Sequence, residues 1–394
     1  MATRSTFDAM LFNQYLRPVR SLVVLSNFTI AQLERKRAQT FGRRFEFGVH
    51  TNSAQSIGTV PEMADTPEPM DEEFTSGYDT VVATVGTCRI SEDLLESTRR
   101  GESAYISPLR DQMVRMGRNL SAEMNRIIHG SGDGALCLLN GAVDGSTTVV
   151  TDTPGTKYLK RRMVLDVWDS NTSKYNAIGV QIASVTDSTD FELTSEIDGA
   201  TNATVVRHGA LDSSGNVNEQ HGLQNIILGS GTLHNINPST YPEWISSVTA
   251  VSGDPTEIKL ITILDNIEVA SGRRPGSDSF AVTTQGVRRN IFAQMADKVR
   301  FAPQVFKGGW EGLWVEGLGL TGVDTDCATE TLYVIDKNAI EIRDLGDFRW
   351  QDRDGSVLHR LNRKLGYELK TYRYWQMITR ERNALGKGTG ITEA

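Results

Sequence analysis

The stretch "SPLRDQMVRMGRNLSAEMNRIIHGSGDG", Ser107 to Gly134, is the clearest secondary-structure signal in the chain. Ser107 suits a helix N-cap, Pro108 suits the first helical position, and Gly130 suits the position just past the end. Between them, apolar residues recur at spacings of three and four along one helix face: Leu109, Met113, Met116, Leu120, Met124 and Ile127. The sequence therefore predicts one helix of about 22 residues, roughly 33 Å long.

An acidic, proline-rich loop lies upstream of this helix. The segment "PEMADTPEPMDEE", Pro61 to Glu73, holds six carboxylates, three prolines and no basic residue. Because prolines fix φ and remove hydrogen-bond donors, we expect an extended, solvated loop. It separates two strand-like runs, the alternating residues from Phe41 and "YDTVVATVGTCRI" from Tyr78. The sequence therefore predicts a long protruding hairpin over residues 41–90, because ordinary hairpin loops have only about 2 to 5 residues.

Opposite charges stand close together in this part of the chain. The carboxylates of the loop are Glu62, Asp65, Glu68, Asp71, Glu72 and Glu73. A basic cluster lies just before the first strand or at its start: Arg35, Lys36, Arg37, Arg43 and Arg44. Two charge blocks of opposite sign favour docking of one molecule on another. These eleven residues are therefore the candidate intersubunit contact.

The composition changes downstream of the predicted helix. Residues 142–215 are rich in Thr, Ser, Asp and Asn, with short alternating runs that predict an inserted antiparallel barrel or sandwich. From Leu223 the pattern predicts helices around Trp244 and Ile261, a buried strand in "SFAVTTQ" and a helix in "GVRRNIFAQMADKV". This alternation indicates a compact α/β or α+β domain. A long strand is predicted from Gly366 to Arg380.

Composition limits the class of protein. With 394 residues, the chain is long enough for two or three domain cores, and a net charge of −8 argues against nucleic-acid binding by the whole surface. Cys88, Cys137 and Cys327 form no CxxC pair, so we expect buried thiols in a reducing compartment. No apolar run approaches the length that spans a bilayer, about 20 residues. We expect a protein that is neither secreted by an N-terminal signal nor embedded in a membrane.

The sequence contains no pattern typical of a catalytic, cofactor-binding or metal site. The GxSxG, HExxH and P-loop patterns are absent, and "HGSGDG" follows a helix instead of a strand, which predicts a turn. None of the histidines is spaced as metal ligands are, and most are predicted at the surface or in turns: His50, His129, His208, His221, His234 and His359. We therefore expect no enzyme, no cofactor and no metal.

The order of these pieces resembles the tailed-bacteriophage major capsid proteins, which have the Hong Kong-type shell fold. Similar to that family are "TCRISEDLLEST" (Thr87–Thr98), the helix ending in a glycine-rich turn, "TYPEWISSV" with "VASGRRPGSDSFAVT", and "WQDRDGSVLHRL" with "ELKTYRYWQMITRERNALGKGTGI". The resemblance covers most of the chain and implies an α+β fold. Its parts are an N-terminal arm (1–40), an extended hairpin or E-loop (41–90), a peripheral domain with the spine helix (91–141), an axial α/β domain (216–330), and C-terminal strands of the peripheral domain with a tail (331–394). The inserted β-rich domain (142–215) is additional to the minimal fold of the family.

The same resemblance implies a function. Such proteins assemble as pentamers and hexamers into an icosahedral head around double-stranded DNA, with the hairpin lying over a neighbouring subunit. It implies a virion protein that assembles in the host cytoplasm and does not bind a membrane. The implied partners are copies of the same chain, a portal and DNA held non-specifically on the inner face, with a decoration protein left open. An arm of about 40 residues is too short for a fused scaffold, so a separate scaffolding protein is also implied.

Two alternatives stay open on the sequence. A cellular nanocompartment shell of the same fold would enclose an enzyme instead of DNA, although the Ser- and Thr-rich insertion favours the virus. A carbohydrate-active enzyme with a β accessory module belongs to another class. The absence of a signal peptide and of a carboxylate motif weighs against this enzyme.

Overall fold

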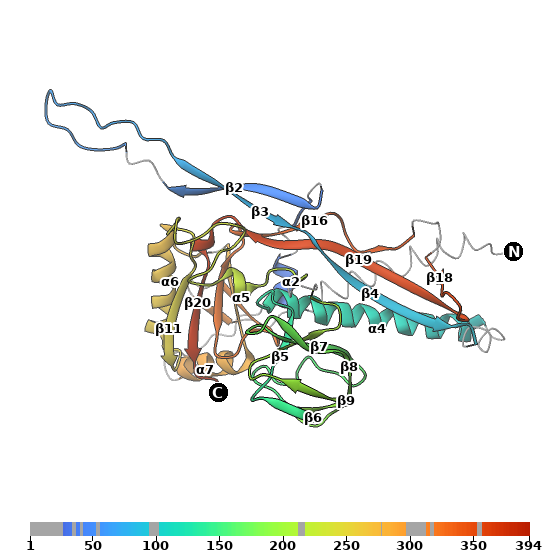
Figure 1. Cartoon of the computed structure of the whole chain (residues 1–394). Coiled ribbons are helices and arrows are strands. Elements are labelled where there is room, and N and C mark those ends of the chain that lie inside the picture. Colours follow the sequence, from blue (N-terminus) through green and yellow to red (C-terminus); the bar gives the residue numbers. More distant parts are fainter. Residues whose placement is uncertain are drawn as a thin grey trace. The chain divides into compact units, whose positions relative to one another are not determined.

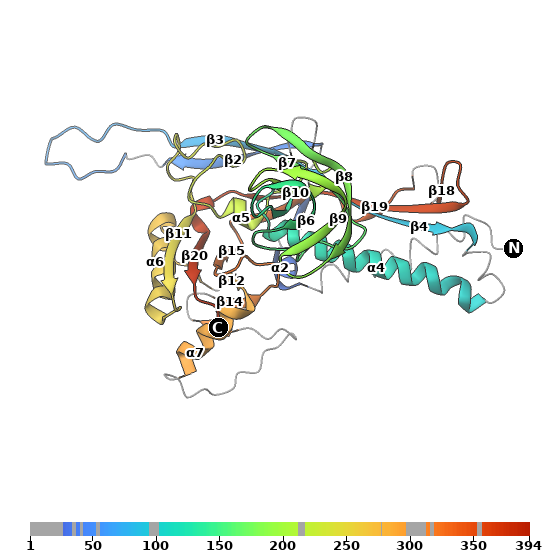
Figure 2. The same ribbon diagram turned by 60° about the horizontal axis from the view of Figure 1, so that its bottom comes forward.

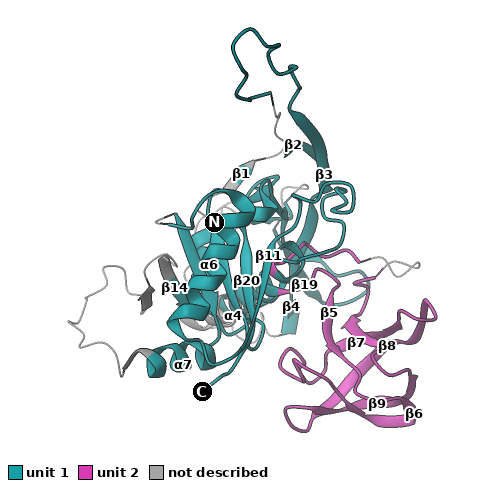
Figure 3. Ribbon diagram, turned by 90° about the vertical axis from the view of Figure 1, so that its left-hand side faces the viewer, with its two compact units in different colours: residues 1–129, 224–394 teal, residues 130–223 magenta. Residues whose placement is uncertain are grey.

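The structure is a computed structural model that describes residues 27–33, 37–39, 42–52, 56–93, 102–211, 217–276, 278–296, 313–315, 319–352 and 357–394. The chain divides into two compact units (Figure 3). Unit 1 comprises residues 1–129 and 224–394, and unit 2 comprises residues 130–223. Among the described residues, none of the helices is both long enough and apolar enough to span a lipid bilayer.

A long helix, α4 (Glu102–His129), runs through unit 1 (Figure 1). The predicted stripe is confirmed where side chains are described, because Met113, Leu120 and Met124 are buried. The helix packs on β4 (Val82–Ser91), where a Cβ at Gly86 would lie 2.9 Å from the Leu120 side chain, so glycine leaves the room that this leucine fills.

The predicted helix start at Ser107 is wrong, because α4 begins at Glu102 and has 28 residues. Pro108 therefore lies inside the helix, where its missing N–H removes one backbone hydrogen bond. Residues 102–106 contain neither glycine nor proline. They extend the helix at its N-terminal end despite that loss.

The first sheet of unit 1 is built around β19 (Gly366–Thr379). The predicted long strand is confirmed as one unbroken strand of 14 residues that ends one residue early. β4 pairs with it antiparallel from Gly366 to Trp375, and β16 pairs antiparallel with its last residues. The remaining strands of this sheet are β1 (Arg37–Gln39), β16 (Ile340–Asp344), β17 (Arg349–Trp350) and β18 (His359–Arg360).

The second sheet of unit 1 has the strand order β11-β20-β15-β12-β14-β13. Its strands are β11 (Ser247–Gly253), β12 (Ser279–Thr283), β13 (Leu313–Val315), β14 (Gly319–Val323), β15 (Leu332–Asp336) and β20 (Gly386–Ile391). The helices α6 (Glu257–Ser271) and α7 (Gln285–Ala296) share one apolar core with this sheet (Figure 2). Both helices and the buried strand β12 confirm predictions. The short elements of this region are α5 (Leu223–Ile226) and the 3-10 turn η2 (Arg382–Ala384).

A short helix, α2 (Phe28–Leu33), packs against the opposite face of the second sheet. The Phe28 ring meets the Phe280 ring edge-on, with 6.1 Å between centroids. Phe280 points away from the α6 side because it neighbours Ala281, which lies in the core shared with α6. A Cβ at Gly322 would overlap the Phe28 ring, so this glycine makes the close approach possible.

Two sequence predictions for unit 1 are wrong. The segment around Trp244 is a series of turns before β11, because Pro238 and Pro242 remove backbone donors that a helix needs. The buried Trp244 indole N–H instead donates to the Leu233 carbonyl at 3.2 Å. The predicted boundary between residues 330 and 331 divides the second sheet, because β15 and β20 pair beside β12 and β11.

Unit 2 is a closed barrel (Figure 3). Its strand order is β5-β10-β7-β8-β9-β6, and an antiparallel bridge between Leu139 and Thr151 joins the two outer strands. The strands are β5 (Ala135–Leu138), β6 (Val143–Val150), β7 (Val164–Asp169), β8 (Lys174–Val185), β9 (Asp190–Gly199) and β10 (Thr204–Arg207). The barrel has an apolar core of its own that includes Phe191 and Val205.

The predicted bounds 142–215 for the inserted unit are too narrow, because β5 follows directly after the glycine-rich turn and belongs to the barrel. Cys137 on β5 lies in the barrel core, where burial raises the pKa of its thiol to about 12. Cys88 and Cys327 are also buried and take part in no disulfide, so the prediction of buried thiols is confirmed.

Candidate subunit-contact surface

The predicted hairpin is built from β2 (Arg44–Asn52) and β3 (Glu73–Thr80), which pair antiparallel. Its second strand-like run divides at Val81, so that β3 pairs with β2 while β4 joins the first sheet. Phe45, Phe47 and Val49 share one face of β2 and pack in a buried cluster with Ile236 and Trp244. The base of the hairpin is therefore held by the core of unit 1, whereas the loop beyond the strands extends away from it (Figure 1).

All six predicted carboxylates lie on this hairpin, and all are exposed. Glu72 has an ionic contact within the chain, a distance of 3.5 Å from its Oε2 to Nε2 of His50. Among the described residues, no lysine or arginine lies within ion-pair distance of any of the six. The negative charge of the loop is therefore largely uncompensated within the described part of one subunit.

The same loop also exposes large apolar side chains, which the sequence prediction missed. Ile57 is 96% exposed, and Met63, Met70 and Phe74 also face solvent. Several large apolar side chains exposed on one projecting loop indicate a surface that a partner covers. The sequence signal was the presence of these residues inside a proline-rich acidic segment, where an ordinary solvated loop would be polar. We name residues Ser56–Phe74, which include the first two residues of β3, the hairpin loop.

The predicted basic cluster does not meet the hairpin loop within one chain, as far as its residues are described. Arg35 and Lys36 lie outside the described residues, and only the backbone of Arg37 is described, at the start of β1. Arg43 is exposed. The Arg44 guanidinium lies 3.9 Å from the Tyr78 ring centroid and 2.9 Å from Oε1 of Glu46. This arginine is therefore occupied at the base of the hairpin.

A second exposed surface lies on the paired strands β4 and β19. Side chains alternate along a strand, so Val85, Tyr372 and Tyr374 share the face that points away from α4. Val85 is 54% exposed and stands opposite Tyr372, whose ring centroid lies 5.7 Å from that of Tyr374. Two cations lie on the same face. Nε of Arg89 is 3.5 Å from Oε1 of Glu368, and Nζ of Lys370 is 3.6 Å from Oε2 of Glu368. We name these five apolar, aromatic and basic residues the tyrosine face.

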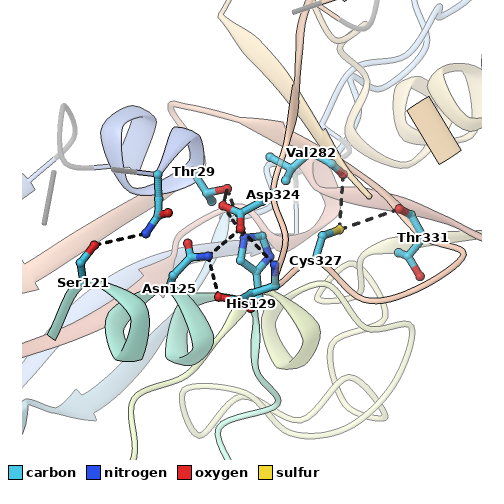
Figure 4. Close-up of polar contacts among 10 residues, drawn as sticks. Thr29, Ser121, Asn125, His129, Val282, Asp324, Cys327 and Thr331 are labelled. Atoms are coloured by element: carbon cyan, nitrogen blue, oxygen red, sulfur yellow. Dashed lines mark hydrogen bonds and ion pairs between the residues drawn. The ribbon is translucent and has the colours of Figure 1, made fainter. Parts of the chain in front are cut away.

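A buried polar cluster holds α2, the end of α4 and the connection after β14 together (Figure 4). The Thr29 hydroxyl donates to Oδ2 of Asp324 at 2.9 Å, and Nε2 of His129 lies 3.2 Å from the same oxygen. Nδ2 of Asn125 donates to Oδ1 of Asp324 at 2.6 Å and to Oδ2 of Asp326 at 2.7 Å. We name these five residues the anchor cluster, because they fix α2 to the end of the long helix α4.

The environment of Asp324 favours its ionised form. Burial alone would raise the pKa of this carboxyl, but the hydrogen bond and charge of His129 and the donors of Asn125 and Asp326 outweigh it. The pKa of Asp324 is therefore held well below its usual range. Most histidines were predicted at the surface or in turns, and His129 is an exception, because it is buried at the end of α4.

Comparisons with known proteins agree with this architecture at the level of the fold. No family model and no curated protein matches the sequence. Among solved structures, the capsid asymmetric unit of cyanophage A-1(L) matches 92% of this chain and 92% of its own chain, with a TM-score of 0.58 and 12% identity.

Two further structures match with lower scores. The capsid of a native GTA particle covers 92% of this chain and 90% of its own, with a TM-score of 0.48 and 11% identity. The holo-SrpI encapsulin complex from Synechococcus elongatus PCC 7942 covers 91% of this chain and 87% of its own, with a TM-score of 0.43 and 9% identity.

The match to the cyanophage capsid runs over nearly the whole of both chains, although few residues are identical. The α+β architecture described above is therefore the Hong Kong-type shell fold. The resemblance inferred from the order of the sequence motifs is confirmed for the fold.

Proposed function

We propose that this chain is the major capsid protein of a tailed phage, which assembles as pentamers and hexamers into an icosahedral shell around double-stranded DNA. The observation that carries the proposal is the likeness to the cyanophage capsid subunit over nearly the full length of both chains. The exposed hairpin loop supports it independently. A loop with uncompensated carboxylates and exposed apolar side chains is suited to contact another copy.

In this proposal the hairpin loop of one subunit lies on the tyrosine face of its neighbour. Ile57, Met63 and Met70 would cover the exposed Val85 and the two tyrosines, while the carboxylates would meet Arg89 and Lys370. Four residues of the neighbour's basic cluster, Arg35, Lys36, Arg37 and Arg43, would supply further positive charge, whereas Arg44 is engaged by Glu46 and Tyr78 of its own chain. Each exposed ion pair contributes only about 0 to 1 kcal/mol to the free energy of association. Closed symmetry repeats the same contact around the shell, so the summed contribution stabilises the assembly.

The proposed partners follow from the shell. They are further copies of this chain, a separate scaffolding protein, a portal, and DNA held non-specifically on the inner face. The protein would assemble in the host cytoplasm and remain in the virion. We assign it a structural role and no reaction.

Electron microscopy of the purified protein, together with native mass spectrometry, tests this function. We expect closed shells, or pentameric and hexameric rings that close when a scaffolding protein is supplied. Nuclease-protected DNA inside particles from infected cells supports a phage head, whereas a packaged enzyme would indicate a nanocompartment. A protein that stays monomeric at all concentrations and ionic strengths would contradict the proposal.

A further inference from the structure

The outward face of α6 exposes apolar side chains around an acidic residue. Leu260, Ile263, Leu264 and Ile267 turn towards the sheet, so the opposite side of the helix faces solvent. On that side Ile258 is 77% exposed and Val269 is 86% exposed, and Asp265 lies on the same stripe between them. Among the described residues, no cation lies within ion-pair distance of the Asp265 carboxylate.

The outward face of α7 has the opposite charge. Val287 and Ile291 turn towards the same sheet core, which leaves Gln285, Arg289 and Phe292 facing solvent. Phe292 is 42% exposed. Within the described part of the chain, no carboxylate lies within ion-pair distance of Arg289. This face therefore also combines an exposed apolar side chain with a charge that has no partner.

The two faces complement each other but do not meet within one chain. Both helices are fixed to the same sheet through their buried sides, and the described contacts include no ion pair between Asp265 and Arg289. Because both faces belong to one rigid core, the α6 face can bind an α7 face only if that α7 face belongs to a second copy of the chain. Such a contact is heterologous, since two different faces meet. It produces a ring when the rotation from each copy to the next adds up to one full turn.

We infer that the α6 face of one subunit binds the α7 face of the next, so that these helices form the contact around each capsid ring. This inference rests on the proposed function and identifies the partner as a second copy of this chain. Ile258 and Val269 would pack against Phe292 of the neighbouring copy, and Asp265 would pair with Arg289 of that copy. Burying apolar area on both sides provides the affinity, whereas the charge pair provides register and direction.

Single charge reversals test the contact. Asp265→Arg and Arg289→Asp should each reduce ring or shell yield at least ten-fold at low salt, because each places like charges opposite one another. Both side chains are exposed, so circular dichroism and thermal melting should show a folded subunit. Glu196→Arg and Lys174→Asp are matched controls, because they reverse exposed charges on the barrel and should assemble as the wild type does.

Combining the reversals tests the direction of the contact. A chain that carries both Asp265→Arg and Arg289→Asp should regain assembly, because each altered face again meets its complement. An equal mixture of the two single variants should form only even-membered rings, since favourable contacts then alternate between the variants. Native mass spectrometry should detect hexamers without pentamers in this mixture.

The outcomes separate this inference from the proposed function. If the wild type assembles and either single variant assembles equally well, the inference is wrong while the capsid function stands. If the single variants fail but the double variant does not recover, the two residues are not partners and the inference is also wrong. A wild type that forms no rings or shells under any condition overturns both.

Discussion

Two groups of carboxylates in this protein have opposite surroundings. In the anchor cluster, Asp324 is buried and accepts hydrogen bonds from three side chains and a backbone N–H. In the hairpin loop, the six carboxylates are exposed, and among the described residues the only ionic contact is from His50 to Glu72. The same chemical group therefore stabilises the isolated subunit in one place and leaves charge available for a neighbour in the other.

The difference indicates where each region contributes free energy. A buried carboxylate with a complete set of donors is costly to disturb, because its partners would be left unpaired away from water. An exposed carboxylate contributes little to the folding of its own chain. The anchor cluster should therefore affect stability, and the hairpin loop should affect assembly.

Asp324→Ala should have the largest effect. It leaves His129 and Asn125 without their buried acceptor, which we expect to lower the free energy of unfolding by about 3 to 5 kcal/mol. Denaturant unfolding followed by tryptophan fluorescence measures this loss. Asp71→Ala is the exposed control and should change stability by at most about 0.5 kcal/mol. Equal, small effects of both substitutions would remove the distinction between the two regions.

Acid should weaken the same cluster. The folded-state pKa of Asp324 is lowered, so its contribution is fully present above the ordinary aspartate pKa, about 4, and is lost as the pH falls further. The groups that face this carboxylate are His129 and Asp326. Melting temperature measured against pH should therefore decline more steeply below about pH 4 in the wild type than in Asp324→Asn. Parallel curves would contradict this assignment.

Thr29→Val should have an intermediate effect. The substitution keeps the shape of the side chain but removes the hydroxyl that donates to Asp324 and contacts Nε2 of His129 at 3.1 Å. We expect a loss of about 1 to 3 kcal/mol in the free energy of unfolding. Faster proteolysis near α2 should accompany it, because this contact helps hold the helix in place. A variant as stable as the wild type would show that apolar packing of Phe28 alone anchors α2.

Replacing Asp71, Glu72 and Glu73 together by alanine should affect subunit stability least. We expect a change in unfolding free energy within about 0.5 kcal/mol, because all three side chains are exposed. Shell yield should nevertheless fall in a salt-dependent way, since salt screens exposed charges over roughly 8 to 10 Å. Wild-type assembly at both low and high salt would mean that these three carboxylates make no electrostatic contact with the neighbour.

Periodic elements of the fold were predictable from the sequence. The stripe through Met113, Leu120 and Met124 fixed the position of α4, and strict alternation identified β19, because both patterns repeat over many residues. Single-residue signals were less reliable. Pro108 suggested a helix start that the structure places inside α4, and apolar residues near Trp244 suggested a helix where two prolines prevent one.

The candidate surfaces were only partly predictable. The acidic loop was evident because its six carboxylates fall within one short segment of the sequence, whereas the tyrosine face joins strands that are far apart in the sequence. The anchor cluster left no sequence signal, because Thr29 and Asp324 are separated by 295 positions and no spacing rule relates them. His129 resembled the other isolated histidines until the fold placed it beside a buried carboxylate.

Hydrogen exchange of the hairpin loop tests the central proposal most directly, because it compares the same residues in dissociated subunits and in assembled particles. We predict that the amides of residues 56–72 exchange rapidly in the subunit and become protected in the particle. The barrel core around Phe191 and Val205 should be equally protected in both states and serves as the internal reference. Closed particles in which residues 56–72 still exchange as rapidly as in the free subunit would contradict the proposal that this loop contacts a neighbouring subunit.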